Sequence, residues 1–233
     1  YKHGLRRADR IVAQTLRQQR GLRLAVGLES QVIPMATACP WSGASREVRP
    51  HSAKRVLWVG RITPEKRLDY LLEAARRCPE ITFEIVGTPN KASEYATGLL
   101  DQAARLSNVK SHGRLPRSEL SQLYLNCRLL CCTSILEGFP TTFLEAWSCG
   151  LPVVTTFDPD DTVARHGLGR VAANVDEVVL QVREMLGNDE TYARVSRAAR
   201  QYYTENHTVE AVSRRFRSVF EKLAVSQDTA NRA

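Results

Sequence analysis

Long hydrophobic runs are missing from this sequence: no stretch approaches the about 20 consecutive apolar residues that a membrane-spanning helix needs. The six cysteines form no C-x-x-C pair and the five histidines do not cluster, so no metal or disulfide framework is indicated. A zinc site using Cys127 and Cys131 remains an alternative, but no second pair of ligands accompanies them. Internal repeats, low-complexity segments and a recognisable signal peptide are also missing. We therefore expect a globular protein whose cysteines are buried thiols in a reducing compartment.

Positive charge is plentiful, with 33 lysines and arginines against 25 aspartates and glutamates, and a net charge of +8. Such a surplus favours an anionic partner, namely a nucleotide, a nucleic acid or an acidic membrane surface. A nucleic-acid binder is expected to show a basic stripe or interleaved aromatic residues. The sequence shows neither, because its arginines are spread widely, and we expect no nucleic-acid partner.

The most informative stretch runs from Thr133 to Thr156. The apolar run at 129–132 before it predicts a buried strand, and a loop containing Gly138 follows. A helical pattern begins at Thr141 and ends at Gly150, and residues 151–154 predict the next strand. Strand, loop, helix and strand form a parallel α/β unit whose loop lies at the carboxyl end of the strand. Open α/β sheets bind their ligands at that end.

Two carboxylates flank the start of this helix. Glu137 lies on the loop, and Glu145 lies about one turn inside the helix. The helix N-terminus between them presents free N–H groups that suit a phosphate. Ionised carboxylates only accept hydrogen bonds, which suits the hydroxyl groups of a ligand. The alternative is a charge that stabilises its own helix and a solvated loop residue.

A second loop carries two cations. Residues 60–66, G-R-I-T-P-E-K, follow a predicted strand at 55–59 and open a helix. Gly60 lets the backbone turn tightly. Arg61 and Lys66 at the carboxyl end of a strand suit a pyrophosphate, which a guanidinium binds bidentately and an ammonium binds as a point charge. The alternative is two surface cations at a helix start, where the helix dipole disfavours them.

The string E-G-F-P-x-x-x-L-E-A-x-x-x-G-x-P-V-V, which begins at Glu137, resembles the E-x7-E signature of family-4-type retaining glycosyltransferases with the GT-B fold. The string G-R-x-x-x-E-K, which begins at Gly60, resembles the diphosphate-binding loop of the same family. Two positions depart from the pattern. The family usually has glycine where this chain has Pro140, which lacks an N–H, and more often has glycine where this chain has Arg67.

The resemblance implies roles for these residues. Arg61 and Lys66 would hold the diphosphate of the donor and stabilise the leaving nucleotide, and Glu137 would bind hydroxyls of the transferred sugar. These three are the catalytic candidates. The donor-binding candidates are Gly60, Gly113, Leu115, Gly138, Phe139, Thr141, Thr142 and Glu145.

Within that set, Glu145 would bind the ribose, the loop at 113–115 would lie near the base, and the backbone around 139–142 would face sugar and phosphate. The family's glycine-rich turn is matched only in part by residues 87–90. The family needs no metal, and we interpret the acidic cluster at 158–161 as a polar turn.

Alternating strands and helices predict a Rossmann-like parallel sheet with helices on both faces, and Arg61 and Glu137 at one carboxyl edge. By resemblance this is the C-terminal half of a GT-B fold. Residues 1–36 would end the N-terminal, acceptor-side domain, and 37–53 would be a linker. Residues 54–204 would form the nucleotide-sugar-binding domain, 205–225 a helix that crosses back, and 226–233 a disordered tail.

The implied reaction moves a hexosyl group, with retention, from a nucleotide-diphosphate sugar to a hydroxyl of a glycan, a lipid-linked saccharide or a small molecule, as in polysaccharide biosynthesis. No cofactor is expected. A GT-B active site lies between two domains, so this chain alone is expected to be inactive. The alternatives are a sugar-nucleotide epimerase of the same fold and a non-catalytic nucleotide-binding module. We expect a cytoplasmic location and consider peripheral contact with an anionic inner membrane face.

Overall fold

The computed structural model describes residues 2–38, 54–89 and 93–230, and the side chains of 3–38, 54–89 and 93–224. The chain divides into two compact units. Residues 39–202 form the larger unit, and residues 1–38 and 203–233 form the smaller one. The linker predicted at 37–53 falls almost entirely outside the described residues.

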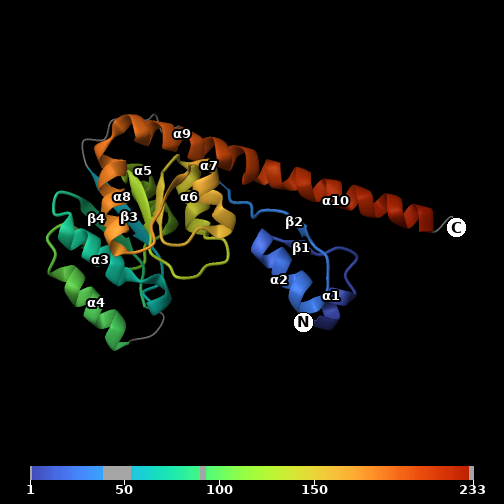
Figure 1. Ribbon diagram of the computed structural model, residues 1–233, viewed down its shortest axis with the longest axis horizontal. Coiled ribbons are helices and arrows are strands. Elements are labelled where there is room, and N and C mark those ends of the chain that lie inside the picture. Colours follow the sequence, from blue (N-terminus) through green and yellow to red (C-terminus); the bar gives the residue numbers. More distant parts are fainter. Residues whose placement is uncertain (1, 39–53, 90–92, 231–233) are drawn as a thin grey trace. The chain divides into compact units, whose positions relative to one another are not determined.

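The larger unit is built on a six-stranded sheet in which every neighbouring pair is parallel, in the order β5-β4-β3-β6-β7-β8 (Figure 1). The strands are β3 (Arg55–Val59), β4 (Thr82–Val86), β5 (Val109–Ser111), β6 (Leu129–Cys132), β7 (Val153–Thr155) and β8 (Gly169–Val171). The central strands β3, β6 and β7 are apolar runs because both of their faces are covered. The predicted fold class is confirmed.

Helices cover both faces of the sheet (Figure 1). On one face, α3 (Leu68–Arg77) packs against α4 (Glu94–Ala104) and α8 (Val175–Gly187), and their apolar residues form one core with the sheet. Their amphipathic patterns make this possible, as in α3, where Leu68, Leu71, Leu72 and Ala75 are all buried. On the other face lie α5 (Arg117–Asn126) and α6 (Thr141–Ser148).

The strand order reverses direction beside β3. The chain first builds outwards through β4 and β5, and then crosses back to place β6 on the other side of β3. The loops that follow β3 and β6 therefore become neighbours at the carboxyl edge. This is the topological switch point at which open α/β sheets bind ligands.

The smaller unit is formed by the two ends of the described chain. Its elements are α1 (Lys2–Arg6), β1 (Val12–Ala13), α2 (Leu16–Val26), β2 (Gln31–Val32) and α10 (Val209–Ala230). The two short strands pair in parallel, and Ile33 packs with Val212 and Val219 of α10. The helix α9 (Asp189–Asn206) begins in the larger unit and ends in the smaller one.

Three features differ from the sequence-based expectation. The helix α10 continues to Ala230, so residues 226–230 are helical where a disordered tail was predicted. A helix that is already formed gains one hydrogen bond for each residue added, so its last turns need no apolar face. Two short helices, α1 and α7 (Thr162–His166), were not predicted. The acidic cluster at 158–161 agrees with the predicted polar turn: it includes a 3-10 turn, η2 (Pro159–Asp161), and the Asp158 carboxylate accepts hydrogen bonds from the amides of Val163 and Ala164 in α7.

Candidate functional site

Three glycines form the start of the carboxyl edge, where β3, β4 and β5 end. The Gly60 amide donates to the Val86 carbonyl at 3.0 Å, and the Gly87 amide donates to the Gly113 carbonyl at 2.7 Å. Gly87 has φ +150°, and a Cβ atom there would lie 1.7 Å from the Gly60 carbonyl oxygen. Only glycine permits this close approach. Gly87 was left out of the predicted site, although a glycine directly after an apolar strand was the signal that could have found it.

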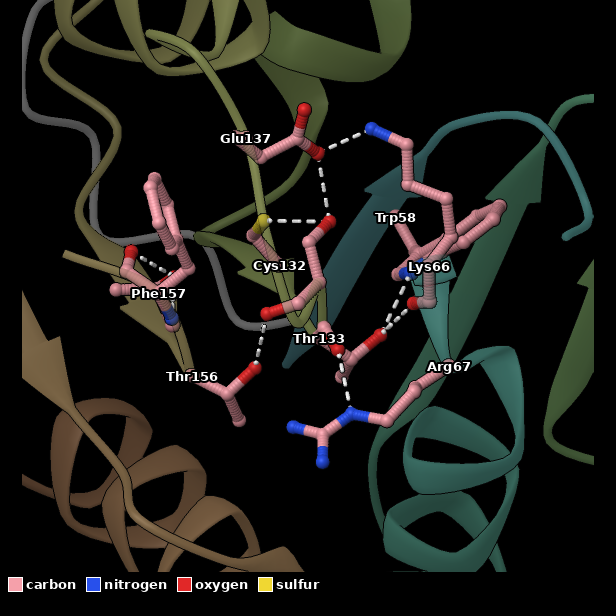
Figure 2. A network of polar contacts seen from close by, with 10 residues as sticks. Trp58, Lys66, Arg67, Cys132, Thr133, Glu137, Thr156 and Phe157 are labelled. Atoms are coloured by element: carbon pink, nitrogen blue, oxygen red, sulfur yellow. Dashed lines mark hydrogen bonds and ion pairs between the residues drawn. The ribbon is translucent and has the colours of Figure 1, made fainter. Parts of the chain in front are cut away.

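An ion pair lies at the switch point. The Nζ of Lys66 contacts Oε1 of Glu137, and Figure 2 shows the two side chains pointing toward each other from the loops after β3 and β6. Lys66 belongs to a 3-10 turn, η1 (Pro64–Lys66). The side chains are 23% and 17% exposed, so a ligand can reach both. The structure thus brings together two of the three catalytic candidates.

The Glu137 carboxylate is held in place by its own loop. Ser134 is buried, and its Oγ donates to Oε1 of Glu137 at 2.7 Å. The Ser134 carbonyl in turn accepts from Oγ1 of Thr156 at 2.9 Å. One carboxylate oxygen therefore receives both Lys66 and Ser134, and Ser134 is a site residue that sequence analysis missed.

Thr133 joins the two loops (Figure 2). Its Oγ1 accepts from the indole Nε1 of Trp58 at 3.1 Å and donates to the Lys66 carbonyl at 2.6 Å. Its carbonyl accepts from Nε of Arg67 at 3.1 Å. A fourth hydrogen bond, from the Ile135 amide to the Glu65 carbonyl at 2.8 Å, also connects the loops. Trp58 and Thr133 are both buried, so the hydrogen bond between them is shielded from water.

Arg61 lies on the same loop as Lys66 with its side chain exposed. Within the part of the chain that the structure describes, it makes no hydrogen bond or ion pair. The pKa of Glu65 is lowered by its own backbone amide, then by the Thr63 hydroxyl, and to a smaller degree by the charge of Arg61. Arg61 is therefore an exposed cation at the carboxyl edge of the sheet.

Glu145 lies one turn inside α6 and is 15% exposed. Its Oε2 accepts from the Tyr124 hydroxyl at 2.8 Å, and its Oε1 lies 3.6 Å from Nη2 of Arg117. Burial raises the pKa of Tyr124 well above its usual range, and the Glu145 carboxylate raises it further, so the phenol remains a donor. A carboxylate offers about four lone-pair directions, so Glu145 keeps capacity for further hydroxyl groups.

The start of α6 completes this side of the site. Pro140 precedes the helix and is buried. The amides of Thr141 and Thr142 belong to the first turn of α6, where a helix offers no carbonyl to accept their hydrogen bonds. Gly138 is exposed. Phe139 is half-buried, with its ring 6.1 Å from the buried Trp147 ring in an edge-to-face arrangement. The buried face of α6 thus fixes the position of the loop in front of it.

The loop after β5 contains the remaining candidates, Gly113 and Leu115. Gly113 adopts φ +63°, a left-handed conformation that favours glycine. The preceding residue, His112, has its Nε2 2.7 Å from Oε2 of Glu84, a buried carboxylate on β4 that also lies 3.6 Å from Arg55. The glutamate in the apolar strand I-T-F-E-I-V was the missed signal for this contact.

Among the described residues, no group of three or more His, Cys, Asp or Glu side chains is placed to hold a metal ion. Cys78, Cys127, Cys131, Cys132 and Cys149 are buried thiols, as predicted for cysteines in apolar segments. None of the helices that the structure describes is both long and apolar enough to cross a membrane.

Comparison with known proteins identifies the family. Residues 44–202 match the family of glycosyl transferases group 1, and the chain belongs to this family. Among curated proteins, it is 28% identical over 167 residues to the GtfA subunit of a UDP-N-acetylglucosamine–peptide N-acetylglucosaminyltransferase of Streptococcus parasanguinis, covering 66% of this chain and 32% of that protein. It is 37% identical over 103 residues to a D-inositol 3-phosphate glycosyltransferase of Mycobacteroides abscessus, covering 42% and 23%.

Solved structures share the fold. HepE of Anabaena in complex with UDP matches with a TM-score of 0.80 at 20% identity, covering 94% of this chain and 65% of that one. Sucrose-phosphate synthase of Thermosynechococcus elongatus matches with a TM-score of 0.77 at 20% identity, covering 97% and 61%. The chain therefore spans less than two thirds of these two structures and about a quarter to a third of the two curated relatives. The likeness confirms the predicted fold, that of the C-terminal half of a GT-B glycosyltransferase.

Proposed function

We propose that this chain is the donor-binding half of a family-4-type retaining hexosyltransferase. The enzyme moves a hexosyl group from a nucleotide-diphosphate sugar to a hydroxyl of a glycan, a lipid-linked saccharide or a small molecule, as in polysaccharide biosynthesis. The observation that carries this proposal is the Lys66–Glu137 pair at the switch point of the sheet, with Glu145 one turn inside the adjoining helix. Sugar-side carboxylate, cation and ribose-side carboxylate then follow one another along a bound donor, whose diphosphate lies between the sugar and the ribose.

In this proposal the two cations bind the diphosphate. Arg61 has a guanidinium without a partner among the described residues, and Lys66 exchanges its contact with Glu137 for the more highly charged diphosphate when the donor enters. Both then stabilise the negative charge that grows on the leaving nucleotide as the bond between C1 of the sugar and the phosphate oxygen breaks. No metal or cofactor is required for this stabilisation.

The carboxylates bind hydroxyl groups. Ser134 keeps Glu137 in position when Lys66 moves away, so that this carboxylate can accept hydrogen bonds from the transferred sugar. Glu145 accepts from the ribose, and Gly113 and Leu115 lie beside the base. The acceptor oxygen forms its bond to C1 on the face that the diphosphate leaves, and the departing diphosphate takes the proton of the acceptor hydroxyl.

The relatives support this class of reaction and differ in donor and acceptor. Structures of HepE hold UDP and UDP-glucose, and other relatives are described as a peptide N-acetylglucosaminyltransferase and an O-antigen chain mannosyltransferase. We therefore assign neither base nor sugar, and choose UDP as the first probe.

We propose that a second domain supplies most of the acceptor site, that this chain alone does not turn over, and that the enzyme is cytoplasmic. Peripheral contact with an anionic membrane is tested with phosphatidylglycerol vesicles.

A thermal-shift panel of UDP-, GDP- and ADP-sugars, with and without EDTA, tests the proposal. A ligand at about 100 times its Kd stabilises the folded chain by about 2.7 kcal/mol. The sugar nucleotides of one base are expected to raise the unfolding temperature by the same amount with and without EDTA. Lys66→Ala is expected to reduce this rise. A chain that none of the donors stabilises contradicts the proposal. Binding accompanied by release or epimerisation of the sugar without an acceptor favours an epimerase, and binding without any turnover by the intact protein favours a non-catalytic module.

A further inference from the structure

Arg67, directly after Lys66, has an unusual backbone conformation. Its φ is 43° and its ψ is 57°, in the left-handed region that side chains other than glycine rarely adopt. Glycine would adopt this conformation without strain. The arginine is therefore present at the expense of backbone strain, and its side chain is expected to provide something that glycine cannot.

The Arg67 side chain makes two specific contacts. Its Nε donates to the Thr133 carbonyl at 3.1 Å, and its guanidinium carbon lies 3.9 Å from the centre of the Tyr70 ring. Figure 2 shows the side chain reaching from η1 towards Thr133 on the neighbouring loop. A solvated surface arginine would make neither contact. The stacking on Tyr70, at the start of α3, fixes the plane of the guanidinium.

We propose that Arg67 is a positioning residue for the reaction, which holds the loop after β6 against the loop after β3 so that Lys66 and Glu137 face each other. The connection passes through Thr133, whose carbonyl accepts from Arg67 and whose hydroxyl donates to the Lys66 carbonyl. Thr133 thus connects Arg67 to the backbone of Lys66 and to the start of the segment that carries Glu137. The loop contact rests on the structure alone, and its consequence for donor binding rests on the proposed function.

The first test needs no ligand. The Ile135 amide donates to the Glu65 carbonyl, so its hydrogen exchange reports whether the two loops stay together. We expect Arg67→Gly to accelerate exchange of this amide by about tenfold or more relative to the wild type, since a hydrogen bond from a charged donor is lost. Arg67→Lys, which keeps the charge but not the planar Nε donor, is expected to give most of the same acceleration.

The matched control is Asp161→Gly. Asp161 also has a left-handed backbone, with φ 57°, but lies outside the β3 and β6 loops. This variant relieves the same kind of strain and is expected to leave exchange of the Ile135 amide unchanged. Arg67→Asn provides a second variant, because asparagine tolerates the left-handed conformation and lacks the guanidinium. Unchanged Ile135 exchange in Arg67→Gly and Arg67→Asn overturns the proposal.

The second test measures calorimetric affinity for UDP and for uridine. If Arg67 positions Lys66 for the diphosphate, Arg67→Gly weakens UDP binding by about tenfold and leaves uridine binding unchanged. Faster Ile135 exchange with unchanged UDP affinity shows a contact that serves only the fold, and overturns the positioning role. If the wild type binds no UDP, GDP or ADP, the proposed function fails, and with it the positioning role, while the exchange result still decides whether Arg67 holds the loops together.

Discussion

At the scale of the residue, the site combines groups that are already paired with one that is not. Lys66 and Glu137 neutralise each other, and Ser134 holds the carboxylate, so the proposed donor binding would have to exchange one charge contact for another. Arg61, in contrast, is exposed and makes no ion pair within the described residues. The two cations should therefore respond differently to substitution.

We expect Arg61→Ala to reduce kcat by at least about 10²-fold, comparable to the loss of one preorganised donor, because in the proposed function its charge acts mainly on the breaking bond. Stability should change by less than about 0.5 kcal/mol, because the side chain is exposed. Arg61→Lys should restore only part of the rate. Steady-state kinetics of the intact enzyme measure this, with Arg105→Ala, an exposed arginine just after α4, as the control. A raised KM with unchanged kcat would make Arg61 a docking residue only.

Substitution of Glu145 also affects Tyr124, whose hydroxyl donates to the Glu145 carboxylate. Glu145→Ala is expected to weaken nucleotide binding by about 1.5–3 kcal/mol, but it also removes the acceptor of a buried hydroxyl and costs about 1–3 kcal/mol of stability. Glu145→Gln keeps an acceptor for Tyr124, so it should lower affinity with little loss of stability.

Calorimetry with UDP and urea unfolding separate these two effects of Glu145. Tyr124→Phe is the control, because it removes the hydroxyl and leaves the carboxylate in place. Full affinity in Glu145→Gln would mean that the carboxylate charge does not contact the ribose.

At the scale of the element, the sequence predicted the central strands β3, β6 and β7 because each lies in an apolar run bounded by turn residues. It also predicted that Arg61 and Glu137 share one edge, since parallel strands end on the same side. The contact between Lys66 and Glu137 was beyond the sequence, because these residues are 71 positions apart and meet only if β6 pairs with β3. The left-handed backbone of Arg67 was not predicted, because arginine itself gives no signal for it, although the glycine that the resembled family more often has at this position was one.

The glycines that end β3 and β4 provide a test at this scale. Gly87→Ala would place a Cβ atom 1.7 Å from the Gly60 carbonyl oxygen, and is expected to destabilise the chain by about 2–5 kcal/mol. Gly98→Ala is the matched control, because it lies in α4 with no atom within 4 Å of the added Cβ and should stabilise by about 0.5–1 kcal/mol. Urea unfolding measures both. Equal stability of the two variants would contradict the close approach of residue 87 to the Gly60 carbonyl.

At the scale of the whole molecule, the two ends of the described chain fold together. The segment after β2 contacts the junction of α9 and α10 through three hydrogen bonds: Tyr203 hydroxyl to Thr37 carbonyl, Thr37 amide to His207 carbonyl, and Nδ1 of His207 to Met35 carbonyl. The resemblance implied a helix over 205–225 that crosses back, but no signal in the sequence indicated these three hydrogen bonds to residues 35–37. The assignment of residues 1–36 to a preceding domain stays a prediction.

His207 makes this contact sensitive to pH. Burial lowers the pKa of His207 to about 4 from its ordinary 6.5, and the nearby Arg215 lowers it further, while the Met35 carbonyl acts in the opposite direction. Below pH 6.5 the unfolded chain therefore binds a proton that the folded chain does not. Stability is fully present above pH 6.5 and falls as the pH drops towards 4, at about 1.4 kcal/mol per pH unit and by roughly 3 kcal/mol in all.

We expect His207→Gln to remove this part of the pH dependence, because an amide can still donate to the Met35 carbonyl but does not titrate. Urea unfolding followed by far-UV circular dichroism at pH 7.5, 6.0 and 4.5 measures the slope in both proteins. The carboxylates titrate in both, so the difference between the slopes belongs to His207. The variant is expected to be less stable than the wild type at pH 7.5 and to approach it at pH 4.5. Parallel slopes would mean that His207 is accessible to protons in the folded state, and that the contact between residues 35–37 and the α9–α10 junction opens on its own.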